Sequence, residues 1–235
     1  MKTILLKLAG PMQSWGTSSR FETRHTDRYP SKSAVTGILA ASCGFSRDDS
    51  RVKKLGQLDF AVRVDQPGEL LADFHVARRL KPDGTLDQAY VTNRYYLQDA
   101  VFVVALGGSD EEWMDDLENA LRHPYFQPYL GRRSNPLNAD FFLGTQKKDV
   151  ITCLEELPWQ ASDWYRSRQT GRVVLPIYAD AHLLGGSPRQ MVRDSVVTFS
   201  QRERRHGYRA VGRKDVVFLS TGGASVSDHD AFNAV

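Results

Sequence analysis

The sequence predicts an α+β fold of the ferredoxin-like type, a split βαβ repeat, and three observations lead to this prediction. In the first 150 residues the patterns follow the order strand, helix, strand, strand, helix, strand. The candidate strands are short apolar runs bounded by glycine, proline or polar residues. The composition, with 41% hydrophobic and 25% charged residues, is that of an ordinary globular domain. We expect both helices to cover one face of the sheet.

The first strand and the first helix are predicted from local signals. The apolar run at residues 4–8 is ended by Gly10 and Pro11, which is typical of a buried strand. Ser33 is a plausible N-cap, and Gly44 is suited to the end of the helix. The residues of this helix that share a face are Val35, Ile38, Leu39 and Ser42.

The second strand and the segment after it differ in regularity. Phe60, Val62 and Val64 alternate with Ala61 and Arg63, as in a half-exposed strand. Residues 74–96 have no clear period, because charged residues, a proline and a glycine interrupt the pattern. We expect an extended hairpin or a projecting loop there, inserted into the domain.

The third strand, the second helix and the fourth strand complete the repeat. Residues 100–106 are almost continuously apolar, which indicates a central strand. Ser109 and Glu112 have the spacing of a capping box for a helix that carries Trp113. His123 and Pro124 end that helix, and residues 141–143 are apolar again.

Beyond residue 150 the apolar runs are shorter, at residues 173–178 and 216–219. We therefore divide the chain into a main domain, residues 1–150, and a small, mostly β C-terminal region, residues 151–235. The insertion at about residues 74–96 belongs to the main domain.

Composition and motifs exclude several classes of protein. Cys43 and Cys153 are the only cysteines, without the spacing of a zinc site or a disulfide framework, which favours a reduced, cytoplasmic protein. No apolar stretch is long enough to span a bilayer, so we expect no membrane association. Because Walker, serine hydrolase and Rossmann motifs are lacking, we expect no cofactor, and the histidine spacing predicts no metal.

Basic residues gather in three places, although the net charge is only +3. Arg24, Arg28 and Lys32 precede the first helix, whose N-terminus attracts anions. Gly131, Arg132 and Arg133 form a turn in which arginine forks could bind phosphates, and Tyr125 and Tyr129 offer faces for stacking on unpaired bases. Each cluster could instead be a solvated surface. A third run contains Arg202, Arg204, Arg205, Arg209, Arg213 and Lys214.

An enzymatic alternative uses the same N-terminal loop. His25, Tyr29 and Lys32 could cleave RNA without a metal, by activating a 2′-hydroxyl and stabilising the phosphorane. One residue of each kind in a short loop is weak evidence for such a site.

Three separated segments, 8–16, 28–33 and 129–134, together resemble one family. Their residues, LAGPMQSWG, RYPSKS and YLGRRS, are similar to the E-subtype members of the fifth CRISPR-associated protein family, the CasD subunits of type I-E Cascade. This family lies within the RAMP superfamily of RRM-like RNA-binding proteins. The resemblance covers residues 1 to about 145, with the three motifs in register, and is weak in the last third.

The resemblance implies a non-catalytic subunit that holds the 5′ handle of the crRNA in antiviral defence. It implies contacts with the backbone subunit and the large subunit of the complex, contact with target DNA only through the complex, and a thumb at residues 74–96. The alternatives are a metal-independent CRISPR repeat endoribonuclease and a free RRM-like regulator of cellular RNA. The expected RNA-binding residues are Gln13, Trp15, Arg24, Arg28, Lys32, Arg78, Arg79, Arg94, Tyr129, Gly131, Arg132 and Arg133.

Overall fold

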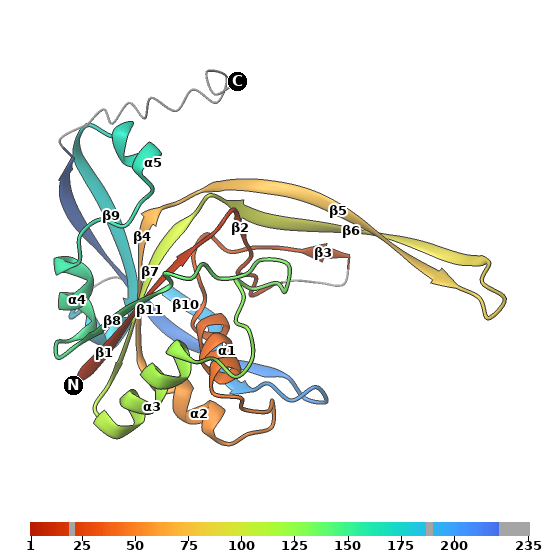
Figure 1. Ribbon diagram of the computed structural model, residues 1–235, viewed down its shortest axis with the longest axis horizontal. Helices are drawn as coiled ribbons and strands as arrows, with labels where there is room; N and C mark the ends of the chain where they lie inside the picture. The colour runs from red at the N-terminus through yellow and green to blue at the C-terminus, as the bar shows by residue number, and fades with distance from the viewer. Residues whose placement is uncertain (19–21, 187–189, 221–235) are drawn as a thin grey trace.

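The computed structural model describes residues 1–18, 22–186 and 190–220, and its centre is a seven-stranded antiparallel sheet (Figure 1). The strand order is β10-β11-β9-β4-β7-β1-β8. This mixed α/β architecture, with few helices and mostly antiparallel pairing, confirms the predicted class. The strands are β1 (Lys2–Ala9), β4 (Asp59–Gln66), β7 (Val101–Gly108), β8 (Phe142–Gln146), β9 (Gly171–Asp180), β10 (Gln190–Thr198) and β11 (Arg205–Ser220).

The two predicted helices, α1 and α3, pack on one face of this sheet as expected, and a further helix that was not predicted, α4, covers the other face. Successive strand side chains point to opposite faces, and in β7 Phe102 and Val104 pack toward α1, α2 and α3 while Val103 packs toward α4. The helix on the second face was not predicted, because α4 begins where the predicted repeat ends. The helices are α1 (Lys32–Ser42), α2 (Arg51–Gly56), α3 (Glu111–Arg122), α4 (Val150–Glu156), α5 (Asp163–Ser167) and the 3₁₀ helix η1 (Ala181–Leu183).

Two predicted helix starts are corrected by the structure. Ser31, not Ser33, caps α1 and accepts a hydrogen bond from the Ala34 amide. Asp110, not Ser109, caps α3 and accepts from the Trp113 amide. The predicted end of α1 is confirmed, because Gly44 takes a left-handed φ of 71° immediately after it.

A second, smaller sheet is formed by β2 (Met12–Gln13), β3 (Thr23–Arg24), β5 (Glu69–Leu80) and β6 (Leu86–Gln98). Figure 1 shows the β5–β6 hairpin projecting far from the body of the molecule. Its strands pair from the Glu69–Gln98 rung to the Leu80–Leu86 rung, so it is longer than the predicted insertion at residues 74–96.

The hairpin has one apolar and one polar face. Opposed residues of an antiparallel pair share a face, so Phe74, Val76 and Val91 lie together on one side. Leu70 and Phe74, which are on this side, are 65% and 66% exposed. The other side carries polar side chains, among them His75, Arg79, Gln88, Tyr90 and Arg94.

The C-terminal strands continue the main sheet and do not form a detached layer. β9 pairs with β4 through the Ala61–Ala179 to Arg63–Ile177 rungs. The division into two regions at residue 150 therefore stays a prediction. Residues 221–235 of the C-terminal region lie outside the described part of the chain.

The strand β4 is buried on both sides, which corrects the expectation of a half-exposed strand. Arg63 is completely buried and forms a two-pronged ion pair with Asp65, with N–O distances of 2.7 and 2.8 Å. Its remaining donors reach the main-chain carbonyls of Leu154 in α4 and of Leu157 and Pro158 just after it. The alternation of apolar residues could not reveal these partners, which lie about ninety residues away along the chain.

Candidate nucleic-acid interface

Three segments that are distant in sequence meet at the base of the hairpin. β3 pairs in parallel with β6, which sets Arg24 beside Arg94. The turn at residues 129–136 is tied to the N-terminal loop by a hydrogen bond from the Ser14 amide to the Leu130 carbonyl, 3.1 Å. The structure therefore brings together Arg24, Arg94 and the arginine turn, which the sequence analysis named as expected RNA-binding residues in separate segments.

Arg132 lies at the centre of this meeting point. Its Nη2 donates to the carbonyls of Arg24 and Tyr95, at 3.1 and 3.2 Å, and its guanidinium lies 4.1 Å from the centre of the Tyr96 ring. Nη1 is buried without a hydrogen-bond partner among the described residues. Arg132 thus holds three segments in place while its positive charge is not neutralised by a carboxylate there.

The backbone geometry at position 131 requires a glycine. Its φ is 82°, and a Cβ at this position would lie 1.7 Å from the Ser14 carbonyl oxygen. The close approach that demands a glycine here is therefore made by the protein backbone.

The remaining arginines of the cluster are accessible. Arg24 and Arg133 are exposed and Arg94 is half-buried, and Arg28, four residues after Arg24 in the same loop, is also exposed. Within the described residues, none of these guanidinium groups forms an ion pair with a carboxylate, whereas Arg63 and Arg79 do.

Aromatic rings accompany these charges. Tyr129 is 37% exposed beside the arginine turn, and the exposed His25 ring stacks on Tyr95 with centroids 5.5 Å apart. The partnership of Tyr96 with Arg132 was not predicted, because no spacing rule connects residues 36 positions apart. Tyr125 lies elsewhere, against Gly44 at the end of α1.

Three predicted contact residues are buried and serve the fold instead. Gln13 donates to the carbonyls of Leu8 and Ala100 and accepts from the Trp15 indole, which is itself buried. Lys32 forms an ion pair with Asp180 at 3.0 Å. In this structure their side chains are buried among protein partners, so the geometry gives no support to a direct side-chain contact with RNA.

The ion pair of Lys32 belongs to a buried network. Arg209 binds Asp180 at 2.9 Å and Asp194 at 2.7 Å, and Asp194 also accepts from the Lys32 amide. Part of the late basic run is therefore internal, and Arg213 is likewise paired with Asp215. The network fastens the start of α1 to the C-terminal strands.

Arg78 and Arg79 are separated from the cluster. They lie on opposite faces of the hairpin, opposite Ala89 and Gln88, about 17 and 20 Å farther out than Arg94 at the rise of an antiparallel β-strand. Arg79 is paired with Asp87 at 3.1 Å and shares its face with Arg94.

The residues of the enzymatic alternative have different ring and ion-pair partners. His25 stacks on Tyr95, Tyr29 stacks on Tyr178 with centroids 4.1 Å apart, and Lys32 is paired with Asp180. Burial raises the pKa of the Tyr29 hydroxyl, which disfavours proton release. Burial also raises the pKa of Cys43 to about 11, so this thiol is not a thiolate nucleophile at neutral pH.

One group of possible metal ligands occurs among the described residues: Asp59, Asp180 and His182. Both Asp180 oxygens already accept from Lys32 and Arg209, and these cations would repel a metal ion. In the same part of the chain, no helix combines the length and the apolar character needed to cross a membrane.

Comparison with known proteins adds independent findings. The family model described as CRISPR-associated protein (Cas_Cas5) matches residues 3–212. The Cascade subunit CasD of Escherichia coli strain K12 is 40% identical over 161 residues, which are 60% of this chain and 70% of the relative.

Two solved structures are similar over nearly the whole chain. One, described as a CRISPR RNA-guided surveillance complex, has 31% identity, a TM-score of 0.77 and 95% coverage of both chains. The other, described as a Cas protein, has 30% identity, a TM-score of 0.63 and coverage of 93% of this chain and 95% of the other.

Proposed function

Because this chain belongs to the Cas5 family of CRISPR-associated proteins, we propose that it is the crRNA-binding subunit of a type I-E Cascade complex that holds the 5′ handle. The observation that carries this proposal is the cluster of arginines at the hairpin base, which has no carboxylate partner among the described residues. Burying or crowding cations without counter-charges is unfavourable, and phosphates would relieve that cost.

We assign β4, β7, β1 and β8, with α1 and α3, to an RRM-like core. The support is their order in the sheet, with every neighbouring pair antiparallel. We assign the β5–β6 hairpin to the thumb. The assignment rests on its projection from the body and its long, exposed strands.

Within this proposal Arg24, Arg28, Arg94 and Arg133 contact phosphates, and Arg132 orders the turn. Tyr129 stacks on an unpaired base. The polar face of the hairpin continues this surface outward through Arg79, and the apolar face packs on a neighbouring protein subunit, the backbone or the large subunit. Target DNA is reached only through the complex, in the cytoplasm.

We further propose that the chain is non-catalytic. The separate partners of His25, Tyr29 and Lys32 support this proposal, since general acid–base chemistry needs groups that reach one reacting atom.

Labelled repeat RNA should therefore stay intact when it is incubated with the purified chain in EDTA and sampled over hours. A discrete product that disappears in the His25→Ala variant would support the endoribonuclease alternative. His123→Ala, at another exposed histidine, is the matched control.

Arg133→Ala and Tyr129→Ala should weaken handle binding in different ways. Loss of Arg133 removes one phosphate contact, so the slope of log K against log salt should fall by about 0.7 for single-stranded RNA, with little regard to sequence. Loss of the Tyr129 ring should cost about 1 to 3 kcal/mol in stacking and leave the slope unchanged. Tyr129→Phe keeps the ring and should bind almost normally. Affinities across a salt series measure both effects.

Arg132→Ala should weaken binding as well, because it also releases the contacts to Arg24 and Tyr95. Normal affinity in all three Ala variants would mean that the turn is only structural and that the RNA lies elsewhere.

A further inference from the structure

A second basic feature lies outside the interface described above. It is a cleft of about 490 Å³ between the loop that precedes α2, α2 itself and the turn that joins β10 to β11. We call it the basic cleft. In Figure 1, β3 lies above α1, whereas α2 lies below it, so the cleft and the candidate interface are built from different elements.

More of the positively charged than of the negatively charged groups in the basic cleft are unpaired and can interact with a ligand. Asp49 is held by Arg51, with N–O distances of 3.0 and 2.7 Å, and Glu203 is paired with Arg205 at 3.3 Å. The Arg51 guanidinium holds the pKa of Asp49 below its usual range, which keeps that carboxylate ionised and paired. The residues that line the cleft and carry charge are Arg47, Asp48, Asp49, Lys53, Arg202, Glu203 and Arg205.

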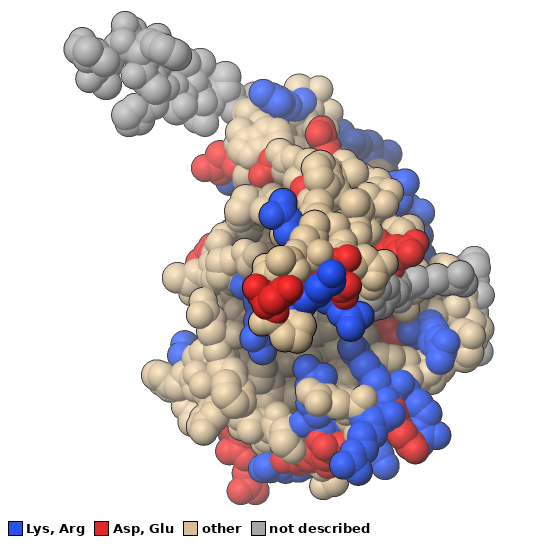
Figure 2. All heavy atoms as spheres, turned by 90° about the vertical axis from the view of Figure 1, so that its right-hand side faces the viewer, with Lys and Arg blue, Asp and Glu red and all other residues tan. Residues whose placement is uncertain are grey.

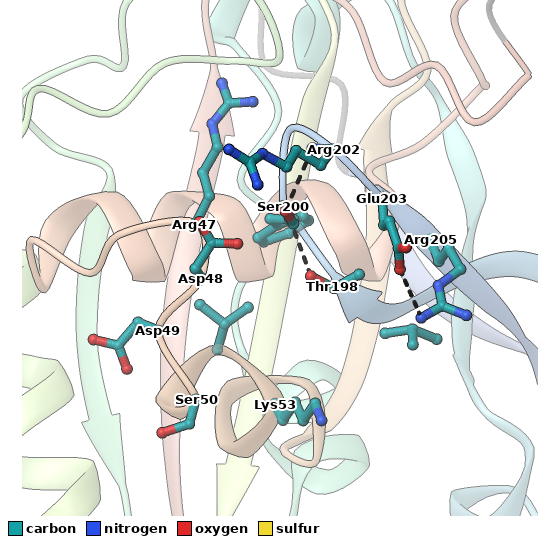
Figure 3. Close-up of a pocket in the computed structure, with 13 residues that line it drawn as sticks. Arg47, Asp48, Asp49, Ser50, Lys53, Thr198, Ser200, Arg202, Glu203 and Arg205 are labelled. Carbon is teal, nitrogen blue, oxygen red and sulfur yellow. Dashed lines mark hydrogen bonds and ion pairs between the residues drawn. The ribbon is translucent and has the colours of Figure 1, made fainter.

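Arg47 and Arg202 have no ion-pair partner within the described ranges, although Asp48 also lines the cleft. Figure 3 shows both guanidinium groups projecting toward the same end of the cleft, one from the loop before α2 and one from the β10–β11 turn. Two like charges directed to one place repel each other unless an anion lies between them.

Hydroxyl groups lie beside these charges, and Val52 and Val197 contribute apolar surface to the cleft. Ser50, Thr198 and Ser200 line the cleft, and the Phe199 side chain packs against the core. Arginine forks with hydroxyl groups are typical contacts to phosphates, whereas base recognition needs an exposed ring or a base-specific edge. Figure 2 shows Lys and Arg gathered below a hollow on this side of the molecule, at the height of α2 in Figure 1.

We propose that the basic cleft is a second phosphodiester-binding site, which contacts the backbone of a nucleic acid without reading its sequence. Arg47 and Arg202 bind the phosphates as forks, and Lys53 and Arg205 add to the attraction. The nucleic acid is either the guide RNA beyond the handle or the DNA that the complex engages, since both present the same phosphodiester chemistry.

The test uses the full chain and the double variant Arg47→Ala/Arg202→Ala. The probes are a labelled single-stranded RNA, a single-stranded DNA and a duplex DNA, all of a sequence unrelated to any CRISPR repeat. Loss of two contacts should lower the salt slope by about 1.4 for single strands and about 1.8 for duplex DNA. The probe whose slope falls by its own expected amount, while the slopes of the others do not, identifies the source. Arg47→Lys/Arg202→Lys should keep the slope, because it keeps both charges.

Arg168→Ala/Arg172→Ala is the matched control, since it removes two exposed arginines near α5 at the far end of the sheet. An unchanged slope for all three probes in a folded double variant would overturn the proposal. The proposal would also be overturned if the double variant bound all three nucleic acids normally and lost binding only to a polyglutamate peptide, because the cleft would then be a site for an acidic protein segment. The Arg133→Ala variant leaves the basic cleft intact. Its affinity for handle RNA therefore tests the proposed handle site separately from the cleft.

Discussion

Removal of the outer hairpin, Val76 to Thr92, with a short glycine bridge, should leave a folded chain that fails to assemble with its partner subunits or to retain the guide. Almost all of this segment is exposed, and Thr92 is its only buried residue. Its loss therefore removes little that stabilises the body. It does remove the exposed Val76 and Val91 of the apolar face together with Arg79 and Tyr90 of the polar face. Yields of co-purified subunits and guide measure the effect.

Paired substitutions separate the two faces of the hairpin. Val76→Ser/Val91→Ser changes one rung of the apolar face and should reduce subunit binding, whereas Gln88→Ser/Tyr90→Ser changes the polar face and should reduce guide retention. Normal yield and guide content for the deleted variant would show that the hairpin is a tolerated surface loop.

Asp65→Ala should lower the free energy of unfolding by about 3 to 5 kcal/mol, because it leaves the buried Arg63 charge without its partner. The same change removes the acceptor of the Gln160 amide, at 2.6 Å. For a chain of this size the loss corresponds to a fall in Tm of about 6 to 20 °C. Thermal unfolding followed by circular dichroism measures it.

Asp215→Ala is the control for this prediction, since Asp215 pairs with Arg213 at 2.9 Å on the surface. Exposed pairs contribute about 0 to 1 kcal/mol. Equal losses of unfolding free energy in the two variants would contradict this prediction, because burial would then add nothing to the cost of breaking the Arg63–Asp65 pair.

Local sequence patterns were sufficient to predict the elements whose formation depends mainly on residues close in sequence. The apolar runs gave β1 and β7, and Gly44 gave the end of α1. The burial of Arg63 and Lys32 could not be predicted, because their partners come from strands and loops that pair only in the folded chain. The helix on the second sheet face was missed for the same reason.

The candidate interface was predictable to a similar extent. Arg24, Arg94 and Arg132 were each named from sequence, but that they meet follows only from the pairing of β3 with β6 and from the contacts of Arg132. Gln13 and Trp15, which lie in the family-like segment 8–16, are buried, because residue identity alone does not distinguish a residue that contacts a ligand from one that supports the fold. The late basic run looked uniform in sequence, yet Arg209 is internal while Arg202 lines the basic cleft.

Co-expression tests the central claim most directly. A tagged version of this chain, produced together with the other subunits of its complex and a CRISPR array, should purify with stoichiometric backbone subunits and one discrete crRNA. The Arg28→Ala/Arg133→Ala variant should retain less of that guide, because two exposed phosphate contacts are gone. Purification of the tagged chain without backbone subunits and without a discrete crRNA would contradict the account.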